Sequence, residues 1–343
     1  MPVRTRSAVC VFAFALALAL PLFAAHAGEA RHVFKMATLA PKGIGWSKAW
    51  EEILAPAILK ATEGGVSFKT YYGGIMGDEE DYIKKMRIGQ LQAASVTAQV
   101  APLICPPFTV LELPFLFENY DEVDYVRERL YPLFDKYFAD KGFALIYWFD
   151  QDFDQIYSVN HRLDTLEDFT RARFLTWYGP VEEATFLAMG VDPIPINGPE
   201  VPAALRQGVV DSVIAPSIWV VGTQTYSILR FVNTAKIRYA PGVNIWSLDA
   251  WKGLPEASRQ KVLTTRGSAL REFITVTRDA NQRGLEALLK YGVKPAHMAP
   301  EQLAIMKDKT HKVWSELSGK LYPPELLDRV TALLREFRQK AAK

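Results

Sequence analysis

Two kinds of apolar pattern alternate in the first part of the chain. Mainly apolar runs of seven or eight residues have the length and composition of buried strands. Between them, large apolar residues recur three and four positions apart, the spacing of a helix with one buried face. Strands and helices in this order predict a parallel sheet with right-handed crossovers. The elements expected are strands at 32–39, 66–72 and 91–97, a helix at 46–60, and a helix at 81–89 with Asp78 as its N-cap.

The same succession returns between residues 144 and 215. Neither a Gly/Ser-rich linker nor a change in composition separates this part from the first. We therefore expect a second α/β unit, joined to the first by strands that cross between them. The elements expected here are strands at 144–148, 155–160, 172–177 and 210–215, and helices at 180–189 and 201–207.

A long helical pattern follows in residues 255–291, which contain no proline after Pro255. A single helix of about 37 residues would be about 55 Å long at 1.5 Å per residue. Because this exceeds the width of one domain, the helix is expected to span both units. Gly267 and Gly284 permit a bend, and a break into two helices is the alternative.

The chain begins with the pattern of a secretory signal peptide, expected over residues 1–27. Two arginines precede an apolar run at residues 8–20, and Ala25-His26-Ala27 places small residues around a cleavable bond. The run of 13 residues is shorter than the roughly 20 that a spanning helix needs, so an uncleaved anchor is only the alternative. The mature protein is expected to be periplasmic and not itself membrane-spanning.

Charge and cysteine usage narrow the class of protein further. The chain has 40 Lys and Arg against 38 Asp and Glu, and removal of Arg4 and Arg6 with the leader leaves 38 against 38. A neutral chain without a basic cluster lacks the field that nucleic-acid binding requires, which excludes nucleic acid as a partner. Of the two cysteines, Cys10 lies in the leader, so Cys105 cannot form a disulfide within the mature chain.

No catalytic motif is apparent. The sequence contains no HExxH, GxSxG or CxxC pattern, and no histidine lies within five residues of another. Asp150, Asp152 and Asp154 have the spacing that opens a calcium loop, but the glycine at loop position six and the closing glutamate are missing. We therefore expect no metal, no cofactor and no enzyme activity, with an exported α/β enzyme as the alternative.

Four segments of the chain resemble a known family in both sequence and order. The chain is similar to the solute-binding proteins of tripartite ATP-independent periplasmic (TRAP) transporters, DctP type, over nearly its whole mature length. This resemblance implies a two-lobed α/β fold of the Venus-flytrap type, with crossing strands and a long helix spanning both lobes. The segments are Tyr72–Glu79 (YGGIMGDE), Leu113–Phe117 (LPFLF), Leu166–Phe169 (LEDF) and Glu200–Asp211 (EVPAALRQGVVD).

The resemblance also implies domain limits and a function. Lobe I is expected to contain residues 28–152 plus about 239–275, and lobe II residues 153–238 plus about 276–343. The implied function is to capture a small organic solute between the lobes and to deliver it to the membrane permease subunits of a TRAP transporter. A ligand-sensing binding protein without a permease is a further alternative.

At one position this sequence departs from the family. The family typically has an arginine, seven residues after the aspartate matched by Asp168, that grips the carboxylate of the solute. Leu175 stands at that position, and a second basic or amide position falls on Asp154 or Gln155. Arg171 and Arg173 lie on the same face of the strand as Leu175, so either is a candidate substitute, and Arg173 is the better one.

A dicarboxylate is therefore not the expected solute, because a buried carboxylate without a basic partner is costly. The aromatic residues near the cleft favour an apolar or planar body, or a cation lying over the rings. Strand ends and the loops after them are where open α/β sheets bind ligands. The residues expected at the site are Thr38, Tyr72, Thr97, Trp148, Gln151, Asp154, Gln155, Arg173, Leu175, Trp177, Ser217 and Trp219.

Overall fold

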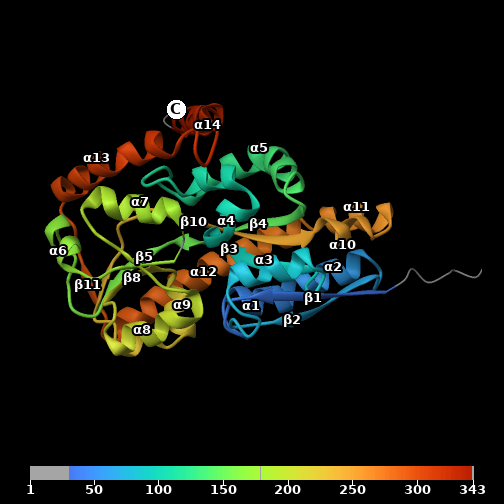
Figure 1. Cartoon of the computed structure of the whole chain (residues 1–343), viewed down its shortest axis with the longest axis horizontal. Helices are drawn as coiled ribbons and strands as arrows, with labels where there is room; N and C mark the ends of the chain where they lie inside the picture. Colours follow the sequence, from blue (N-terminus) through green and yellow to red (C-terminus); the bar gives the residue numbers. More distant parts are fainter. Residues whose placement is uncertain (1–30, 178, 342–343) are drawn as a thin grey trace, which may run out of the picture. The chain divides into compact units, whose positions relative to one another are not determined.

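Two mixed sheets organise the chain in the computed structural model, which describes residues 31–177 and 179–341 (Figure 1). The predicted signal peptide lies outside these residues. The five-stranded sheet has the order β2-β1-β3-β10-β4, and the four-stranded sheet has the order β11-β9-β5-β8. We call the parts built around them lobe I and lobe II.

The strands of lobe I are β1 (His32–Thr38), β2 (Val66–Tyr71), β3 (Ala93–Thr97), β4 (Phe143–Phe153) and β10 (Tyr239–Ser247). Those of lobe II are β5 (Gln155–Ser158), β8 (Ser212–Ala215), β9 (Phe231–Asn233) and β11 (Lys294–Ala296), beside a short pair of β6 (Leu175–Thr176) and β7 (Ile194–Pro195). In lobe I, β1 pairs in parallel with β2 and β3, as predicted, whereas β10 runs antiparallel to β3 and β4.

Helices flank both sheets. In the first half of the chain they are α1 (Trp46–Ala49), η1 (Trp50–Leu54), α2 (Ala55–Ala61), α3 (Glu79–Arg87), η2 (Ala98–Val100), α4 (Ala101–Ile104), η3 (Pro106–Glu112), α5 (Tyr120–Ala139) and α6 (Leu166–Arg171). The later ones are α7 (Pro180–Met189), η4 (Gly198–Glu200), α8 (Val201–Gln207), α9 (Ser217–Gly222), η5 (Thr225–Ser227), α10 (Leu248–Lys252), α11 (Glu256–Thr264), α12 (Ser268–Tyr291), α13 (Pro300–Leu317) and α14 (Pro324–Ala341).

The strands that cross between the lobes are present as predicted. Only Asp154 separates the end of β4 in the first sheet from the start of β5 in the second. The chain returns from β9 to β10, and the two crossings pair with each other on both sides, β5 with β9 and β4 with β10. The predicted lobe limits themselves stay predictions, since residues 31–343 form one unit by their contacts.

The predicted single helix over 255–291 is wrong, because the chain breaks at Thr265–Gly267 and forms α11 and α12. At the break, Arg266 donates from Nε to the Ile146 carbonyl of β4 (2.9 Å) and pairs with Asp135. These bonds to the sheet and to α5 take the place of a continued helix, and Gly267 is the N-cap of α12.

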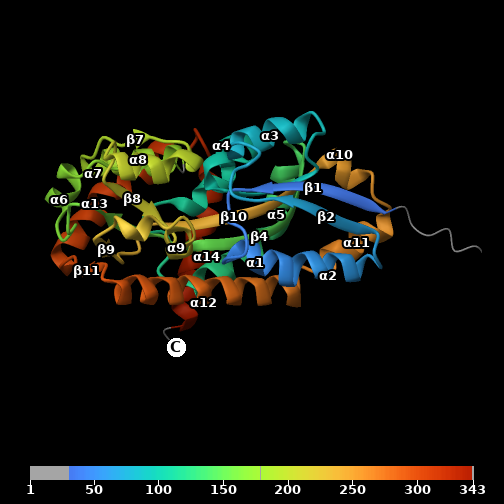
Figure 2. The same ribbon diagram turned by 90° about the horizontal axis from the view of Figure 1, so that it is seen from below.

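The expectation that this helix spans both lobes holds for α12, which is about 36 Å long. Leu270 and Phe273 are buried in a core cluster of lobe I, whereas Leu288 is buried in a cluster of lobe II. Figure 2 shows α12 running beneath both sheets. A rigid element that packs on both lobes limits their relative motion to bending near the crossing strands.

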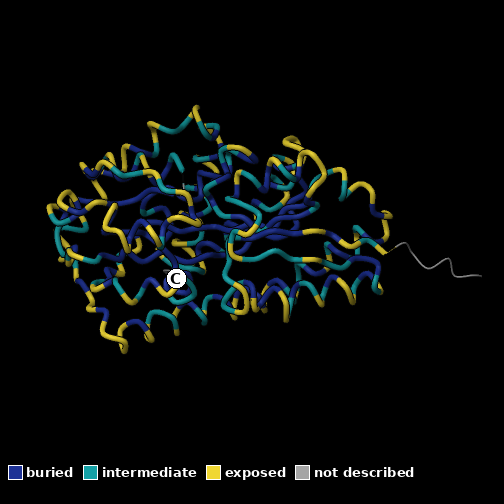
Figure 3. The backbone as a smooth tube through the Cα atoms, turned by 60° about the horizontal axis from the view of Figure 1, so that its bottom comes forward, coloured by how far each residue is buried: buried dark blue, intermediate teal, exposed yellow. Residues whose placement is uncertain are grey.

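The burial pattern places the cores along the strands, which Figure 3 shows as mainly buried backbone. Every residue of β4 is buried, as expected for a strand covered on both faces. Within residues 31–177 and 179–341, no helix combines the length and apolarity that a membrane span requires.

Candidate functional site

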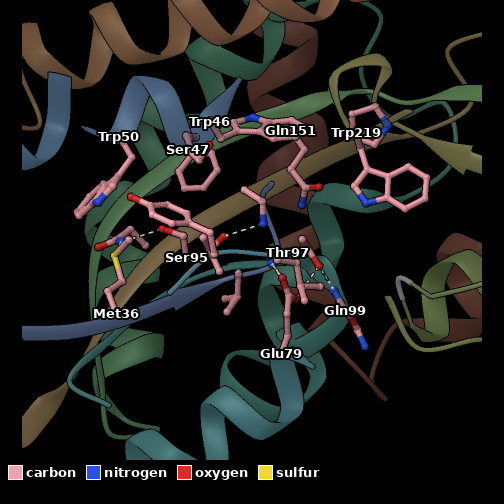
Figure 4. Close-up of a pocket in the computed structure, with 18 of the residues that line it drawn as sticks. Met36, Trp46, Ser47, Trp50, Glu79, Ser95, Thr97, Gln99, Gln151 and Trp219 are labelled. Carbon is pink, nitrogen blue, oxygen red and sulfur yellow. Dashed lines mark hydrogen bonds between the residues drawn. The ribbon is translucent and has the colours of Figure 1, made fainter. Parts of the chain in front are cut away.

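A cavity lies between the two sheets, with an empty volume of about 840 Å³ that includes open solvent at its mouth. Figure 4 shows Trp46, Gln151 and Trp219 along one side and Thr97, Gln99 and Glu79 along the other. The ends of β1 and β3, the middle of β4, the loop after β6 and helix α9 all contribute to the wall, so both lobes supply it. The predicted site residues that line the cavity are Thr38, Tyr72, Thr97, Gln151, Trp177 and Trp219.

Aromatic rings dominate this wall. The Trp177 and Trp219 rings meet edge to face, with centroids 4.8 Å apart and an angle of 71°. On β4 and α12, Phe149 and Phe273 form a second edge-to-face pair at 5.3 Å. Gly242 on β10 makes room for Phe149, since a Cβ atom there would lie 2.4 Å from the Phe149 ring. The cavity aromatics are Trp46, Trp50, Tyr72, Phe149, Trp177, Trp219 and Phe273.

Hydrogen bonds to the protein fix three of the indoles. The Nε1 of Trp46 donates to the Asp150 carbonyl (3.1 Å), and the Nε1 of Trp177 donates to the Ile214 carbonyl (3.1 Å). The Nε1 of Trp50 donates to Thr70 Oγ1 (3.3 Å). Because these N–H groups are already engaged, the three rings offer a solute their faces and edges rather than a hydrogen bond.

The polar groups of the wall are mostly neutral amides and hydroxyls. The Nδ2 of Asn244 donates to Ser95 Oγ (2.9 Å), and the Nε2 of Gln151 donates to the Pro241 carbonyl (3.2 Å). Among the described residues Gln151 Oε1 accepts no hydrogen bond from the protein, so it remains an acceptor for a solute. The wall can therefore orient a ligand by a few polar contacts within a largely apolar space.

Glu79 is the one carboxyl group among the described residues of the wall. It follows the N-cap Asp78 at the start of α3 and is fully buried. The backbone N–H of Thr97 lies 2.9 Å from both of its oxygens, and Thr97 Oγ1 donates to Oε2 (2.7 Å). Burial and, to a smaller extent, the nearby Asp78 charge raise the pKa of Glu79 to about 8, although the Thr97 hydrogen bonds act in the opposite direction.

Trp148 does not reach the cavity. It is fully buried in the lobe I core, in edge-to-face contact with Phe108 and Phe134, and its Nε1 donates to Tyr239 Oη (3.3 Å). Successive side chains of a strand point to opposite faces, so Phe149, the next residue, takes the cavity side.

Arg173 and Leu175 are also outside the wall. Arg173 is exposed and its Nε donates to Asp211 Oδ2 (3.2 Å), so the structure does not support it as a substitute for the missing arginine. Leu175 is fully buried in the lobe II core cluster that also contains Tyr157 and Val213. The apolar side chain at this position packs in the core and presents no charge to the cavity.

Asp154, Gln155 and Ser217 do not line the cavity. Asp154 is buried against Arg238, whose Nη2 donates to its Oδ2 (2.6 Å). Gln155 and Ser217 line a separate polar recess beside Asp152 and Arg278. The pKa of Asp154 is raised to about 6 because burial outweighs the attraction of Arg238.

The alternating aspartates of β4 do not form a calcium loop. Asp150 pairs with Arg127 and Arg278, Asp152 accepts a hydrogen bond from Tyr120 Oη (2.7 Å), and Asp154 pairs with Arg238. Each carboxylate therefore has its own protein partner. Across the described part of the chain, no group of three His, Cys, Asp or Glu residues is arranged to hold a metal ion.

Several residues of the wall were not predicted from the sequence. Trp46 and Trp50 follow the helical spacing of 46–60, which indicates a buried helix face and gives no sign of a cavity. Phe273 is likewise one apolar position of a long helix. Glu79 lies beside Asp78, for which the local pattern signals only an N-cap.

Comparison with known proteins agrees with this architecture. Residues 36–320 match the model of the DctP family, described as bacterial extracellular solute-binding proteins, family 7. A solute-binding protein of Chromohalobacter salexigens is 23% identical over 244 residues, which cover 71% of this chain and 73% of that protein. The C4-dicarboxylate-binding periplasmic protein DctP of Rhodobacter capsulatus is 25% identical over 285 residues, which cover 82% and 84% of the two chains.

Among solved structures, the chain is similar to the sugar acid binding protein DctPAm from Advenella mimigardefordensis in complex with galactonate. The TM-score is 0.84 and the identity 21%, over 90% of this chain and 99% of that chain. This likeness confirms the predicted two-lobed α/β fold. The family match covers well over half of the chain, and this protein is therefore a member of the DctP family of bacterial extracellular solute-binding proteins.

Proposed function

We propose that the chain is exported to the periplasm with loss of residues 1–27 and serves there as the solute receptor of a TRAP-type transporter. It captures one small organic solute between its lobes and delivers it to the membrane permease subunits. The observation that carries this proposal is a cavity whose wall comes from both lobes of a family fold made for solute binding.

Closure around the solute would use contacts that already join the lobes. The backbone N–H of Gly198, before α8 in lobe II, donates to Oδ2 of Asp78 in lobe I (3.2 Å). Gly45 of lobe I approaches Ile218 of lobe II so closely that a Cβ atom on Gly45 would lie 2.3 Å from Ile218 Cγ2. A solute that touches both walls binds the closed state better than the open one, and this difference in affinity shifts the population toward closure.

The crossing strands and α12 are the natural hinge of this movement. Asp154, the single residue between β4 and β5, lies at one crossing. Asn281 of α12 donates to the Gln151 carbonyl (2.6 Å) and accepts from the Ile218 N–H (3.1 Å), so α12 is tied to a strand of lobe I and to a helix of lobe II. Closure would preserve these bonds if it bends the chain only at the crossings.

The relatives support a small organic solute. The Rhodobacter capsulatus relative is described as binding C4-dicarboxylates, and the Advenella mimigardefordensis structure holds galactonate. Both ligands are compact molecules with polar groups on a short carbon frame. A cavity lined by both lobes, with apolar side chains and a few polar groups, is of the kind that holds a small molecule.

The test begins with full-length chain expressed with its leader and purified from the periplasm. Native mass spectrometry is expected to show one small molecule bound per chain, released unchanged on denaturation. Reconstitution of the receptor with its permease in liposomes is then expected to give uptake of that molecule. A bound molecule that is converted to a product would instead support the enzyme alternative, and binding without receptor-dependent uptake would support a sensor.

A further inference from the structure

The charges around the cavity are distributed unevenly. Among the described residues that line it, none is a lysine, arginine or histidine, and Glu79 is the one acid. The arginines near this part of the fold already have carboxylate partners. Arg238 pairs with Glu112 and Asp154, and Arg278 pairs with Asp150.

A carboxylate solute would therefore lose its water without gaining a cation. An uncompensated buried charge is among the most costly events in a protein interior. The family's usual compensation is absent here, because Leu175 is packed in the lobe II core and Arg173 is paired with Asp211 at the surface. This argument disfavours anions and leaves neutral solutes and cations.

The aromatic rings separate these two remaining classes. Elsewhere in the molecule, arginines lie over ring faces, with Arg278 at 4.1 Å from the Tyr120 centroid and Arg127 at 5.5 Å from that of Trp148. Within the described residues, no lysine or arginine lies over the cavity rings of Trp46, Trp50, Phe149, Trp219 or Phe273. These are the faces that attract a cation when water is excluded.

The hydrogen-bond acceptors of the cavity wall are electronegative oxygens, which complement a positively charged solute. Glu79 lies directly behind Thr97, whose hydroxyl and N–H both point at its carboxyl group. Gln151 Oε1 faces the same space from β4. Aromatic faces, an amide oxygen and a carboxyl group all stabilise positive charge, and the described lining contains no basic side chain to oppose them.

We propose that this cavity selects compact organic cations with an alkylated ammonium head, held against the edge-to-face pair of Trp177 and Trp219 and facing the Glu79 side of the wall. This inference rests on the proposed receptor function and specifies the chemical class of its solute. It differs from the carboxylate ligands described for the relatives above.

The ionisation of Glu79 provides a second, independent consequence. Asp78 and Tyr82 are the titratable groups that interact with Glu79 from its own helix, and Thr97 faces it from β3. A bound cation favours the ionised carboxylate, so binding lowers the pKa of Glu79 and releases its proton. Affinity for a permanently charged cation is therefore expected to rise as the pH increases toward about 8, the pKa of Glu79 in the ligand-free protein.

The experiment uses two series of probes that match in shape and differ in charge. The first is choline, 3,3-dimethyl-1-butanol and 3,3-dimethylbutanoate, and the second is tyramine, 4-propylphenol and 3-(4-hydroxyphenyl)propanoate. Affinities are measured by isothermal titration calorimetry on ligand-free protein. We expect one cation to bind at least tenfold more tightly than its neutral isostere, and the matching carboxylate to bind more weakly than both.

Two variants show whether the proposed groups cause the preference. Trp219→Leu keeps an apolar surface but removes a ring face, and it is expected to reduce the ratio of cation to neutral affinity about tenfold. Trp219→Phe is the matched control and should retain most of the ratio. Glu79→Gln is expected to remove the pH dependence of cation binding, with circular dichroism to establish that each variant is folded.

Two results overturn the inference. One is a carboxylate that binds more tightly than the cation of its series, and the other is that neither cation binds. The molecule released in native mass spectrometry then decides whether the receptor function falls as well. A stoichiometric acid or neutral solute keeps the receptor and rejects the cation class, whereas the absence of any bound solute together with failure of both series rejects both.

Discussion

The two faces of strand β4 differ sharply in how their polar groups are satisfied. On one face, Asp150 bonds to Arg127 and Arg278, and Asp152 accepts from Tyr120. On the other face, Phe149 and Gln151 line the cavity. Every residue of the strand is buried, so exposure alone does not distinguish the two faces.

The two faces differ in whether other residues of the protein pair with the polar groups of the strand. Behind the wall, Asp150 is neutralised by arginines from α5 and α12, and Asp152 accepts a hydrogen bond from the Tyr120 hydroxyl, as buried polar groups require in a low-dielectric interior. The cavity face keeps aromatic rings and an amide oxygen without a protein cation. We read the first face as the structural half of the strand and the second as the half reserved for a solute.

The largest expected effect is on the structural face. Asp150→Ala removes the carboxylate that Arg127 and Arg278 share and leaves the buried Arg127 guanidinium with the more exposed Asp124 as its one remaining carboxylate partner among the described residues. The free energy of unfolding is expected to fall by about 3–5 kcal/mol, the usual cost of breaking a buried pair. Urea denaturation followed by circular dichroism measures this change.

The control for this variant is an exposed ion pair. Lys48 and Glu52 lie 3.9 Å apart with most of each side chain in solvent. Glu52→Ala is expected to leave the unfolding midpoint nearly unchanged, because exposed pairs contribute little. Equal losses in Asp150→Ala and Glu52→Ala would contradict the view that the Asp150 network is a stabilising core.

Neighbouring aromatics of β4 give the next largest effect. Phe149→Ala removes a ring of the cavity, and solute affinity is expected to fall about 30-fold, as for a central contact worth about 2 kcal/mol. Trp148→Phe, one residue away, should reduce stability by about 1–3 kcal/mol through lost packing and a lost bond to Tyr239, with affinity unchanged. Loss of affinity in Trp148→Phe would mean that the two faces are not independent.

The sequence predicts the helices and strands of this fold more successfully than the site. Strand and helix periods depend on local spacing, so the elements at 180–189 and 201–207 appear at their predicted positions. The sequence offers the break at Thr265–Gly267 only as an alternative, because the break depends on the Arg266 bonds to β4 and α5, which are distant in sequence. The insertion of β10 antiparallel to β3 likewise depends on residues that are far apart in the sequence.

For the site, strand ends identify half of the predicted residues correctly as cavity lining. The other six predicted residues do not line the cavity, and the reasons depend on contacts between segments that are far apart in the sequence. Whether Trp148 or Phe149 faces the cavity depends on the register of β4 against β10. Asp154 is paired with Arg238, which lies 84 residues further along the chain. Glu79 reaches the wall only because α3 packs its first turn against the end of β3.

Glu79 gives an effect that depends on pH and that is smaller than those above for each pH unit. Its pKa is about 8 in the folded protein against 4.5 for an unperturbed glutamate, so the folded state retains a proton that the unfolded state releases. Between these two values stability is lost as pH rises, by at most about 1.4 kcal/mol per pH unit from this group. Glu79→Gln is expected to remove that contribution, so the variant gains stability relative to the wild type as pH increases.

Urea denaturation at several pH values across this window measures the difference. Glu80→Gln is the matched control, since Glu80 is exposed on the same helix. Its difference from the wild type is expected to stay constant with pH. A constant difference for Glu79→Gln as well would show that Glu79 does not carry the raised pKa, and would weaken its proposed role in cation binding.

The smallest expected effect concerns the contact between the lobes. A Cβ atom on Gly198 would lie 2.9 Å from Leu39 Cδ1, so in Gly198→Ala the end of the Leu39 side chain has to shift at the contact between the lobes. The Gly198 N–H to Asp78 bond across the same contact is expected to lengthen. Solute affinity should fall about three- to tenfold, mainly through faster dissociation, as most interface changes act.

A double-mutant cycle with Leu39→Ala separates this steric effect from a change in the cavity itself. Leu39 lines the cavity, so its truncation alone is expected to reduce affinity. If the contact limits closure, Leu39→Ala relieves the clash, and the double variant loses less affinity than the two single losses combined. Purely additive losses would place the closing contact elsewhere, with Gly45 and Ile218 as the next pair to test, because these residues approach each other even more closely.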